Sequence, residues 1–91
     1  MENIVTLDAI DHSLSDIEFK ILLSLDAHLK NGQISLYKFL ELINQSFGIN
    51  NAYYYVLKLV NNDLVHLNVD VHDARVFYPS LSLVGKNLIK D

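Results

Sequence analysis

The side chains of this chain that could do chemistry gather between residues 50 and 61. Tyr54, Lys58 and Asn61 follow one another at spacings of four and three residues, and Asn50 and Asn51 stand just before them. Such spacing places the first three on one face of a helix, with the asparagines at its N-terminal end. An asparagine amide can pair with an adenine edge, a tyrosine hydroxyl can reach a base or a phosphate, and a lysine can neutralise a phosphate. The pattern predicts a surface for a DNA groove, with Asn50, Asn51, Tyr54 and Lys58 as contacts.

Tyr53 begins a run of three tyrosines that allows two interpretations. It is a further candidate for contact with DNA. The alternative is that these tyrosines serve packing and protein contacts, because tyrosine is enriched at interfaces. No arginine lies between residues 50 and 61, so the commonest specific contact, a bidentate arginine on guanine, is missing, and we expect affinity for A·T-containing sites.

Three helices are expected to position this surface, and the first has the most complete local signals. Ser15 can cap its N-terminus, and Glu18 stands three residues later as the reciprocal partner of a capping box. Asn31 and Gly32 supply a left-handed stop, so this helix is expected from about Asp16 to Lys30. Its apolar stripe consists of Ile17, Ile21, Leu22, Leu25 and Leu29.

The second and third helices form the expected helix-turn-helix. Ser35 is the expected cap of the second helix and Gly48 its end, while Asn50 or Asn51 caps a third helix that runs to about Asn62. The apolar positions of the second helix are Leu36, Phe39, Leu40, Ile43 and Phe47. Two apolar faces compete on the third helix: Ala52, Tyr55, Val56, Leu59 and Val60, or Tyr53, Val56, Leu57, Val60 and Leu64. The sequence alone does not choose between them.

The residues after the third helix have the pattern of a β-hairpin. Apolar and polar side chains alternate from Val65 to Val71, and a second strand is expected after the polar turn that follows. Pro79 falls in that strand, which indicates an edge or a bulge because proline cannot donate to a ladder. Ser82 is expected to cap a short final helix and Gly85 to permit close packing within it. The fold class is therefore α+β, mostly α: a winged helix-turn-helix with three helices, a two- or three-stranded β-wing and a short C-terminal helix.

From approximately Leu14 to Leu88, the order of these motifs along the chain resembles that of the MarR-type winged-helix DNA-binding family. The similarity is most extensive at the wing, where Asp73, Arg75, Leu81, Ser82 and Gly85 keep the spacing of the family's Asp-x-Arg and Leu-Thr-x-x-Gly pattern. Asn51 to Tyr54 stand in the place of the family's Thr-Val-Ser-Arg, so Tyr54 replaces an arginine. That replacement leaves the preferred DNA sequence open.

The resemblance implies roles for the wing and for the ends of the chain. Arg75 would enter or flank the minor groove and Asp73 would orient it. The alternative is that Arg75 only pairs with Asp73 or Asp70 across an exposed turn. The long C-terminal helices through which these regulators dimerise are missing, so no small-molecule effector is expected. A homodimer would use the N-terminal segment 1–13, the first helix or the final helix.

Composition argues against several other classes of protein. With 91 residues, 51% of them hydrophobic, the chain is expected to form a single domain over residues 1–91. The sequence has no cysteine, no signal peptide and no apolar run of membrane-spanning length, so we expect a cytoplasmic protein without disulfides. His66 and His72 are expected on one strand face without the compact spacing of metal ligands. We expect no metal, no cofactor and no catalytic residues, hence no enzyme.

The net charge of −4 opposes DNA binding, but the later part of the chain holds Lys58, Arg75, Lys86 and Lys90. We expect a sequence-specific DNA-binding protein that regulates transcription as a homodimer, with the third helix in the major groove and the wing at the minor groove. The alternatives are a protein-protein interaction module and a partition-type DNA-binding protein of a plasmid or phage. Cations converging on one face would favour DNA, whereas an apolar patch around Tyr54 and Leu57 would favour a protein partner.

Overall fold

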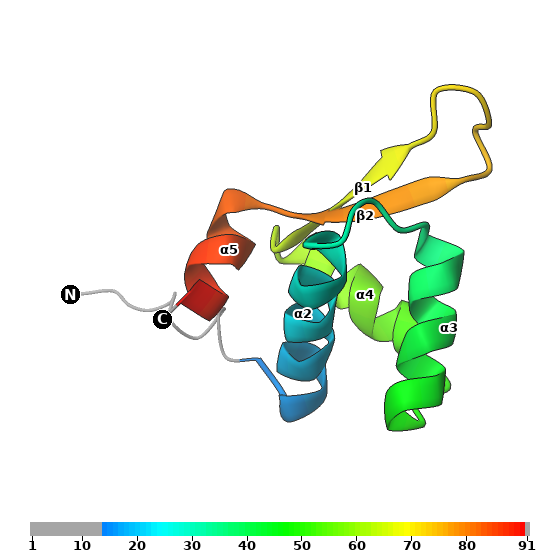
Figure 1. The fold of residues 1–91 in the computed structure, drawn as a ribbon. Coiled ribbons are helices and arrows are strands. Elements are labelled where there is room, and N and C mark those ends of the chain that lie inside the picture. The colour runs from blue at the N-terminus through cyan, green and yellow to red at the C-terminus, as the bar shows by residue number, and fades with distance from the viewer. Residues whose placement is uncertain (1–13, 91) are drawn as a thin grey trace.

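Three helices and a β-hairpin surround one cluster of buried side chains. The computed structural model describes residues 14 to 90, without the side chain of Lys90. The elements are α2 (Asp16–Leu29), α3 (Leu36–Phe47), α4 (Ala52–Asn61), β1 (Val65–Val69), β2 (Phe77–Leu81) and α5 (Leu83–Lys90). The hairpin projects past α3, and α5 lies on the other side of α2 (Figure 1). The predicted winged helix-turn-helix is confirmed, with two strands in the described wing. Segment 1–13, a candidate for dimerisation, lies outside the described residues.

The N-terminus of α2 has the predicted capping box. The Ser15 hydroxyl accepts from the backbone N–H of Glu18 at 3.1 Å, and the Glu18 carboxylate accepts from the backbone N–H of Ser15 at 3.0 Å. Two of the backbone donors at this helix end are thereby satisfied. Gly32 then takes a φ of 118°, a conformation that glycine adopts at little cost, and the chain turns toward α3.

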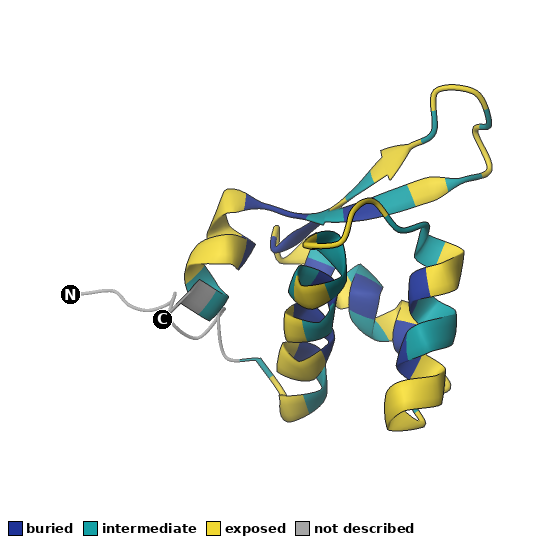
Figure 2. Cartoon of the chain, in the orientation of Figure 1, coloured by how far each residue is buried: buried dark blue, intermediate teal, exposed yellow. Residues whose placement is uncertain are grey.

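The core forms where the inner faces of α2, α3 and α4 meet the base of the hairpin, as the dark blue segments of Figure 2 show. Its buried apolar members are Ile21, Leu22, Leu25, Phe39, Ile43, Ala52, Val56, Leu59, Leu64, Val65 and Leu81. Phe47 continues the predicted apolar stripe of α3, but it is 41% exposed, so the core does not cover the C-terminal end of that stripe. Phe47 lies in the last turn of α3, and the ammonium of Lys20 stands 5.6 Å from its ring centroid.

The wing is an antiparallel pair in which Val65 faces Leu81 and Val69 faces Phe77. Pro79 lies opposite Leu67 with its side chain fully buried. In a two-stranded sheet each strand has an outer edge, which accounts for a proline inside β2. β1 ends at Val69, two residues earlier than predicted.

The end of β1 has a local cause. The Asp70 carboxylate accepts from the backbone N–H groups of His72 and Asp73, at 2.9 and 3.0 Å, and these bonds turn the chain. His72 therefore lies in the wing turn, and the expectation that it shares a strand face with His66 is wrong.

α5 is joined to the base of the wing through Ser82. Its hydroxyl accepts from the backbone N–H of Gly85 at 2.9 Å, as predicted for a cap, and donates to the carbonyl of Asp63 at 2.6 Å. Gly85 also has the predicted packing role, because a Cβ there would collide with the carbonyl oxygen of Leu64.

No helix among residues 14–90 has the length and hydropathy needed to cross a bilayer.

Candidate nucleic-acid interface

The packing of α4 decides between its two predicted apolar faces. Ala52, Val56 and Leu59 are buried, as the first of the two faces requires. Tyr53 and Tyr54 are 51% and 56% exposed. Lys58 and Asn61 are exposed as well. The outward stripe predicted from spacing is therefore present on α4.

Within that stripe, Tyr54 and Lys58 are in contact with each other. The Lys58 ammonium lies 5.4 Å from the ring centroid of Tyr54, a cation–π distance. The Tyr54 ring meets that of Tyr55 edge to face, with centroids 5.2 Å apart. The same ammonium lies 3.7 Å from a carboxylate oxygen of Glu18. Lys58 is therefore directed toward the N-terminus of α2 and is already engaged in an ion pair.

Asn50 and Asn51 are both exposed just before α4, and Asn51 occupies the N-cap position. Its side chain makes no capping hydrogen bond, in contrast to the prediction that an asparagine caps this helix. Its backbone, at φ −108° and ψ 41°, departs from the extended conformation in which a cap side chain reaches back to the first turn. Its amide is thus left to contact other groups.

This difference between the caps has a measurable consequence. We expect Ser15→Ala to lower the free energy of unfolding by about 1 kcal/mol, because the bond from the backbone N–H of Glu18 to the Ser15 hydroxyl is lost while the backbone N–H of position 15 can still donate to Glu18. Asn51→Ala should change it by less than about 0.5 kcal/mol, because no capping bond is removed. Urea denaturation followed by circular dichroism measures both, and equal losses in the two variants would contradict the assignment of caps.

Arg75 and Asp73 form a fork in the wing turn. The Asp73 carboxylate accepts from the backbone N–H, Nε and Nη2 of Arg75 at 3.0, 3.1 and 3.2 Å. These bonds hold the pKa of Asp73 below its ordinary value and raise the pKa of Arg75. Asp70 takes no part in the fork, and its carboxylate accepts from backbone groups of the turn instead. A side-chain hydrogen bond with Asp70 raises the pKa of Tyr78.

The fork leaves part of the guanidinium available. Arg75 is 90% exposed at its side chain, and the Nε edge of the guanidinium is the one that Asp73 occupies. An arginine has five N–H donors, so the edge formed by the two terminal nitrogens still has donors for an anion or a base. Asp73 therefore orients Arg75 while leaving its outer edge open.

A hollow connects the wing with both helices of the helix-turn-helix; we call it the wing hollow. It lies between the N-terminus of α3, the first turn of α4 and the start of β2, and it is lined by Ser35, Leu36, Tyr37, Leu40, Tyr53, Arg75, Val76 and Phe77. The candidates Tyr53 and Arg75 thus border the same concave surface. Figure 1 shows the matching arrangement of elements, with the hairpin passing beside the start of α3.

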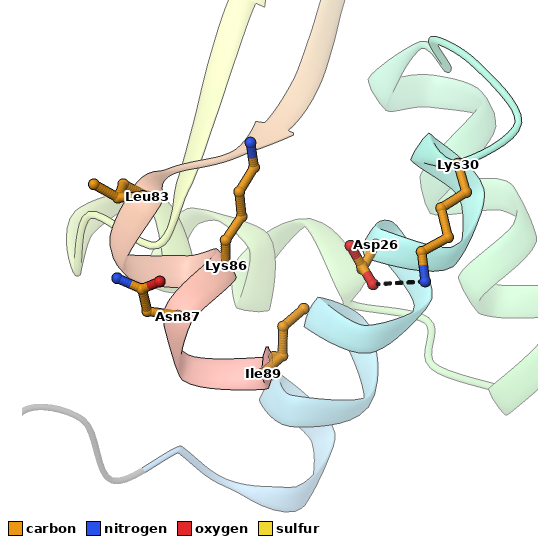
Figure 3. Close-up of a pocket in the computed structure, with 6 residues that line it drawn as sticks. All are labelled: Asp26, Lys30, Leu83, Lys86, Asn87 and Ile89. Atoms are coloured by element: carbon orange, nitrogen blue, oxygen red, sulfur yellow. Dashed lines mark ion pairs between the residues drawn. The ribbon is translucent and has the colours of Figure 1, made fainter. Parts of the chain in front are cut away.

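The other predicted cations do not join Arg75 at the wing hollow. Lys86 lines a separate hollow between α2 and α5, together with Asp26 and Lys30, which form an ion pair at 3.5 Å (Figure 3). Lys58 lies at the opposite end of α2, beside Glu18. The side chain of Lys90 lies outside the described part of the chain. The convergence of cations that would favour DNA is therefore not seen for Lys58, Arg75 and Lys86, which border different parts of the surface.

Three residues at this interface were not predicted from sequence. Tyr37 is 76% exposed and Phe77 is 38% exposed, and both line the wing hollow. An aromatic residue on the polar side of a helical stripe was the available signal for Tyr37. Nothing in the sequence indicated that Glu18, assigned as a capping residue, would also contact Lys58.

The histidines within residues 14–90 form no metal site. Nε2 of His66 lies 3.2 Å from the carboxylate of Asp63 at the exposed start of β1. Over residues 14–90, no group of three or more histidine, cysteine or acidic side chains is arranged to hold a metal ion.

Comparison with known proteins gives one structural likeness. No family model matches the chain, and no curated protein matches it by sequence. The fold is similar to that of the adhesin competence repressor (AdcR) of Streptococcus pyogenes, with a TM-score of 0.63 and 21% sequence identity. The match covers 90% of this chain and 57% of the repressor chain, so the chain spans little more than half of that protein's length. At this identity the likeness establishes the winged-helix fold.

Proposed function

We propose that this chain is a small DNA-binding protein that regulates transcription, with α4 in the major groove and the wing at the minor groove. The observation that carries the proposal is that Tyr53 on α4 and Arg75 on the wing line one concave surface. A duplex that receives the first turn of α4 would thus lie within reach of the wing. The likeness to a repressor and the MarR-type spacing of the wing residues support the regulatory role.

The chemistry of the surface favours A·T-containing sites. Asn51 and Tyr54 supply hydrogen-bonding groups from α4, and neither is occupied by a capping bond. The wing carries Arg75, which is the one arginine of the chain. An arginine that enters a narrow A·T-rich minor groove gains from the strong negative potential there. Asp73 would serve as the residue that fixes the direction of Arg75.

The proposal includes a homodimer. A winged helix that binds as a symmetric pair places its two reading helices in successive major grooves, with half-sites about 34 Å apart. α5 offers apolar side chains for such a contact, since Leu83 is 74% exposed and Val84 is 41% exposed. Sedimentation of the protein with and without a two-half-site duplex tests this part. Binding of a monomer to a single half-site would contradict it.

Binding of selected DNA tests the proposed function. A duplex enriched by the protein from a random pool of sequences is compared with a scrambled duplex by fluorescence anisotropy. Arg75→Ala and Tyr54→Ala should each weaken binding of the selected duplex about tenfold. In Arg75→Ala the salt dependence of the affinity should correspond to release of roughly one counterion fewer. Lys30→Ala is the matched control, because it removes a cation at the far end of α2. It should change the affinity less than about twofold.

A second candidate function is a module that binds another protein through the wing hollow. The observation in its favour is the exposure of Tyr37 and Phe77 beside the apolar side chains of Leu36, Leu40 and Val76. Exposed aromatic groups of this kind are typical of protein interfaces. No preference for selected over scrambled DNA, together with indifference to both substitutions, would favour this second function over the first.

A further inference from the structure

A buried carboxylate holds the cation of the α4 surface. The Glu18 side chain is 8% exposed, and its Oε2 lies 3.7 Å from Nζ of Lys58. The other oxygen, Oε1, accepts from the backbone N–H and the hydroxyl of Ser15. Ser15 fixes the carboxylate at the start of α2. The ion pair therefore forms because the Lys58 side chain reaches to the carboxylate.

Lys58 is the single lysine or arginine of α4. It is therefore the side chain that this helix would use to neutralise a phosphate. Moving Nζ from Glu18 to a phosphate would leave a carboxylate of 8% exposure without its cation. Leaving a buried charge unpaired costs far more than separating an exposed pair. The structure thus opposes the phosphate contact that α4 would otherwise make.

We propose that Glu18 is a specificity-determining residue for DNA binding, which acts by withholding Lys58 from phosphates. The inference rests on the proposed function. Phosphate contacts supply essentially all of the affinity for non-specific DNA, whereas base contacts supply sequence preference. In a complex positioned by Tyr53, Tyr54 and Arg75, Lys58 stays paired with Glu18. Withholding one cation therefore lowers non-specific affinity more than specific affinity.

Glu18→Gln tests this inference, because the amide keeps an oxygen for Ser15 and loses only the charge. Affinity for a scrambled duplex at about 0.1 M salt should rise roughly fivefold. The slope of log K against the logarithm of the salt concentration should become steeper by about 0.9. Affinity for the selected duplex should change less than twofold, so the preference for it falls. Asp26→Asn is the matched control, because it removes one negative charge from α2 and releases the exposed Lys30. It should change both affinities by less than about twofold.

Lys58→Met provides a second variant. In the Glu18→Gln background it should abolish the gain in affinity for the scrambled duplex, because the cation that the first substitution releases is then absent. A DNA-independent readout is the rate at which an amine-acylating reagent modifies Lys58, followed by peptide mass spectrometry. That rate should increase in Glu18→Gln and stay unchanged in Asp26→Asn.

The outcomes separate the two proposals. If the selected duplex binds and Glu18→Gln behaves like Asp26→Asn on scrambled DNA, the role of Glu18 is overturned and the proposed function stands. Failure of the unchanged protein to prefer the selected duplex contradicts the proposed function and, with it, this inference. An unchanged acylation rate at Lys58 in Glu18→Gln overturns the inference by itself, because it shows that the ion pair does not withhold the amine.

Discussion

Replacement of Phe39 by alanine is expected to lower the free energy of unfolding by about 4 kcal/mol. Phe39 has the largest of the fully buried side chains and is 1% exposed. Its ring meets His28 of α2 edge to face, with centroids 6.1 Å apart. Removing the ring loses its burial and opens a cavity between α2 and α3. A loss of this size would remove a large part of the stability of a small domain.

Phe47→Ala is the matched control, because it removes the same ring from the same helix. Phe47 is 41% exposed, so much of its surface already contacts water. We expect a loss below about 1 kcal/mol, including the weak contact with Lys20. Urea denaturation of both variants, followed by circular dichroism, gives the comparison. Similar losses at the two positions would contradict the structure, in which α3 buries Phe39 and exposes Phe47.

The two phenylalanines also show where sequence reasoning about the fold succeeds and where it stops. Both occupy the same apolar stripe of α3, so periodicity alone did not distinguish them. Which end of the stripe is covered depends on where α2 and the hairpin lie, and that arrangement is a property of the whole fold. The start of α2 and the end of α3 were predictable for the opposite reason. The bonds between Ser15 and Glu18, and the left-handed φ of 66° at Gly48, depend on residues within one turn.

The candidate site divides in the same way. The fork between Asp73 and Arg75 was among the predicted alternatives, because the two residues are close in sequence and of opposite charge. The outward direction of Tyr54 and Lys58 followed from helical spacing under either register of α4. The pairing of Lys58 with Glu18 could not be predicted, since it depends on how α4 crosses the start of α2. The same holds for the approach of Tyr37 to the wing.

Gly85→Ala is expected to lower the free energy of unfolding by about 3 kcal/mol, although alanine favours helices more than glycine does. An added Cβ would collide with the carbonyl oxygen of Leu64 and would lie 3.2 Å from its carbonyl carbon. That oxygen also accepts from the backbone N–H of Ser82 at 3.0 Å. Neither partner is a flexible side-chain tip, so α5 or the backbone at Leu64 has to move.

This movement should reach the proposed DNA surface as well. Leu64 directly precedes β1 and Ser82 directly follows β2, so a displacement at their hydrogen bond shifts the base of the wing that carries Arg75. Gly85→Ala should therefore weaken binding of a selected duplex even at temperatures where the variant is folded. Asn87→Ala is the control, because Asn87 is exposed on the same helix and its loss should cost less than about 0.5 kcal/mol. A Gly85→Ala protein as stable as Asn87→Ala would show that α5 does not lie against Leu64, and the wing would then lack the support on which the proposed role of Arg75 depends.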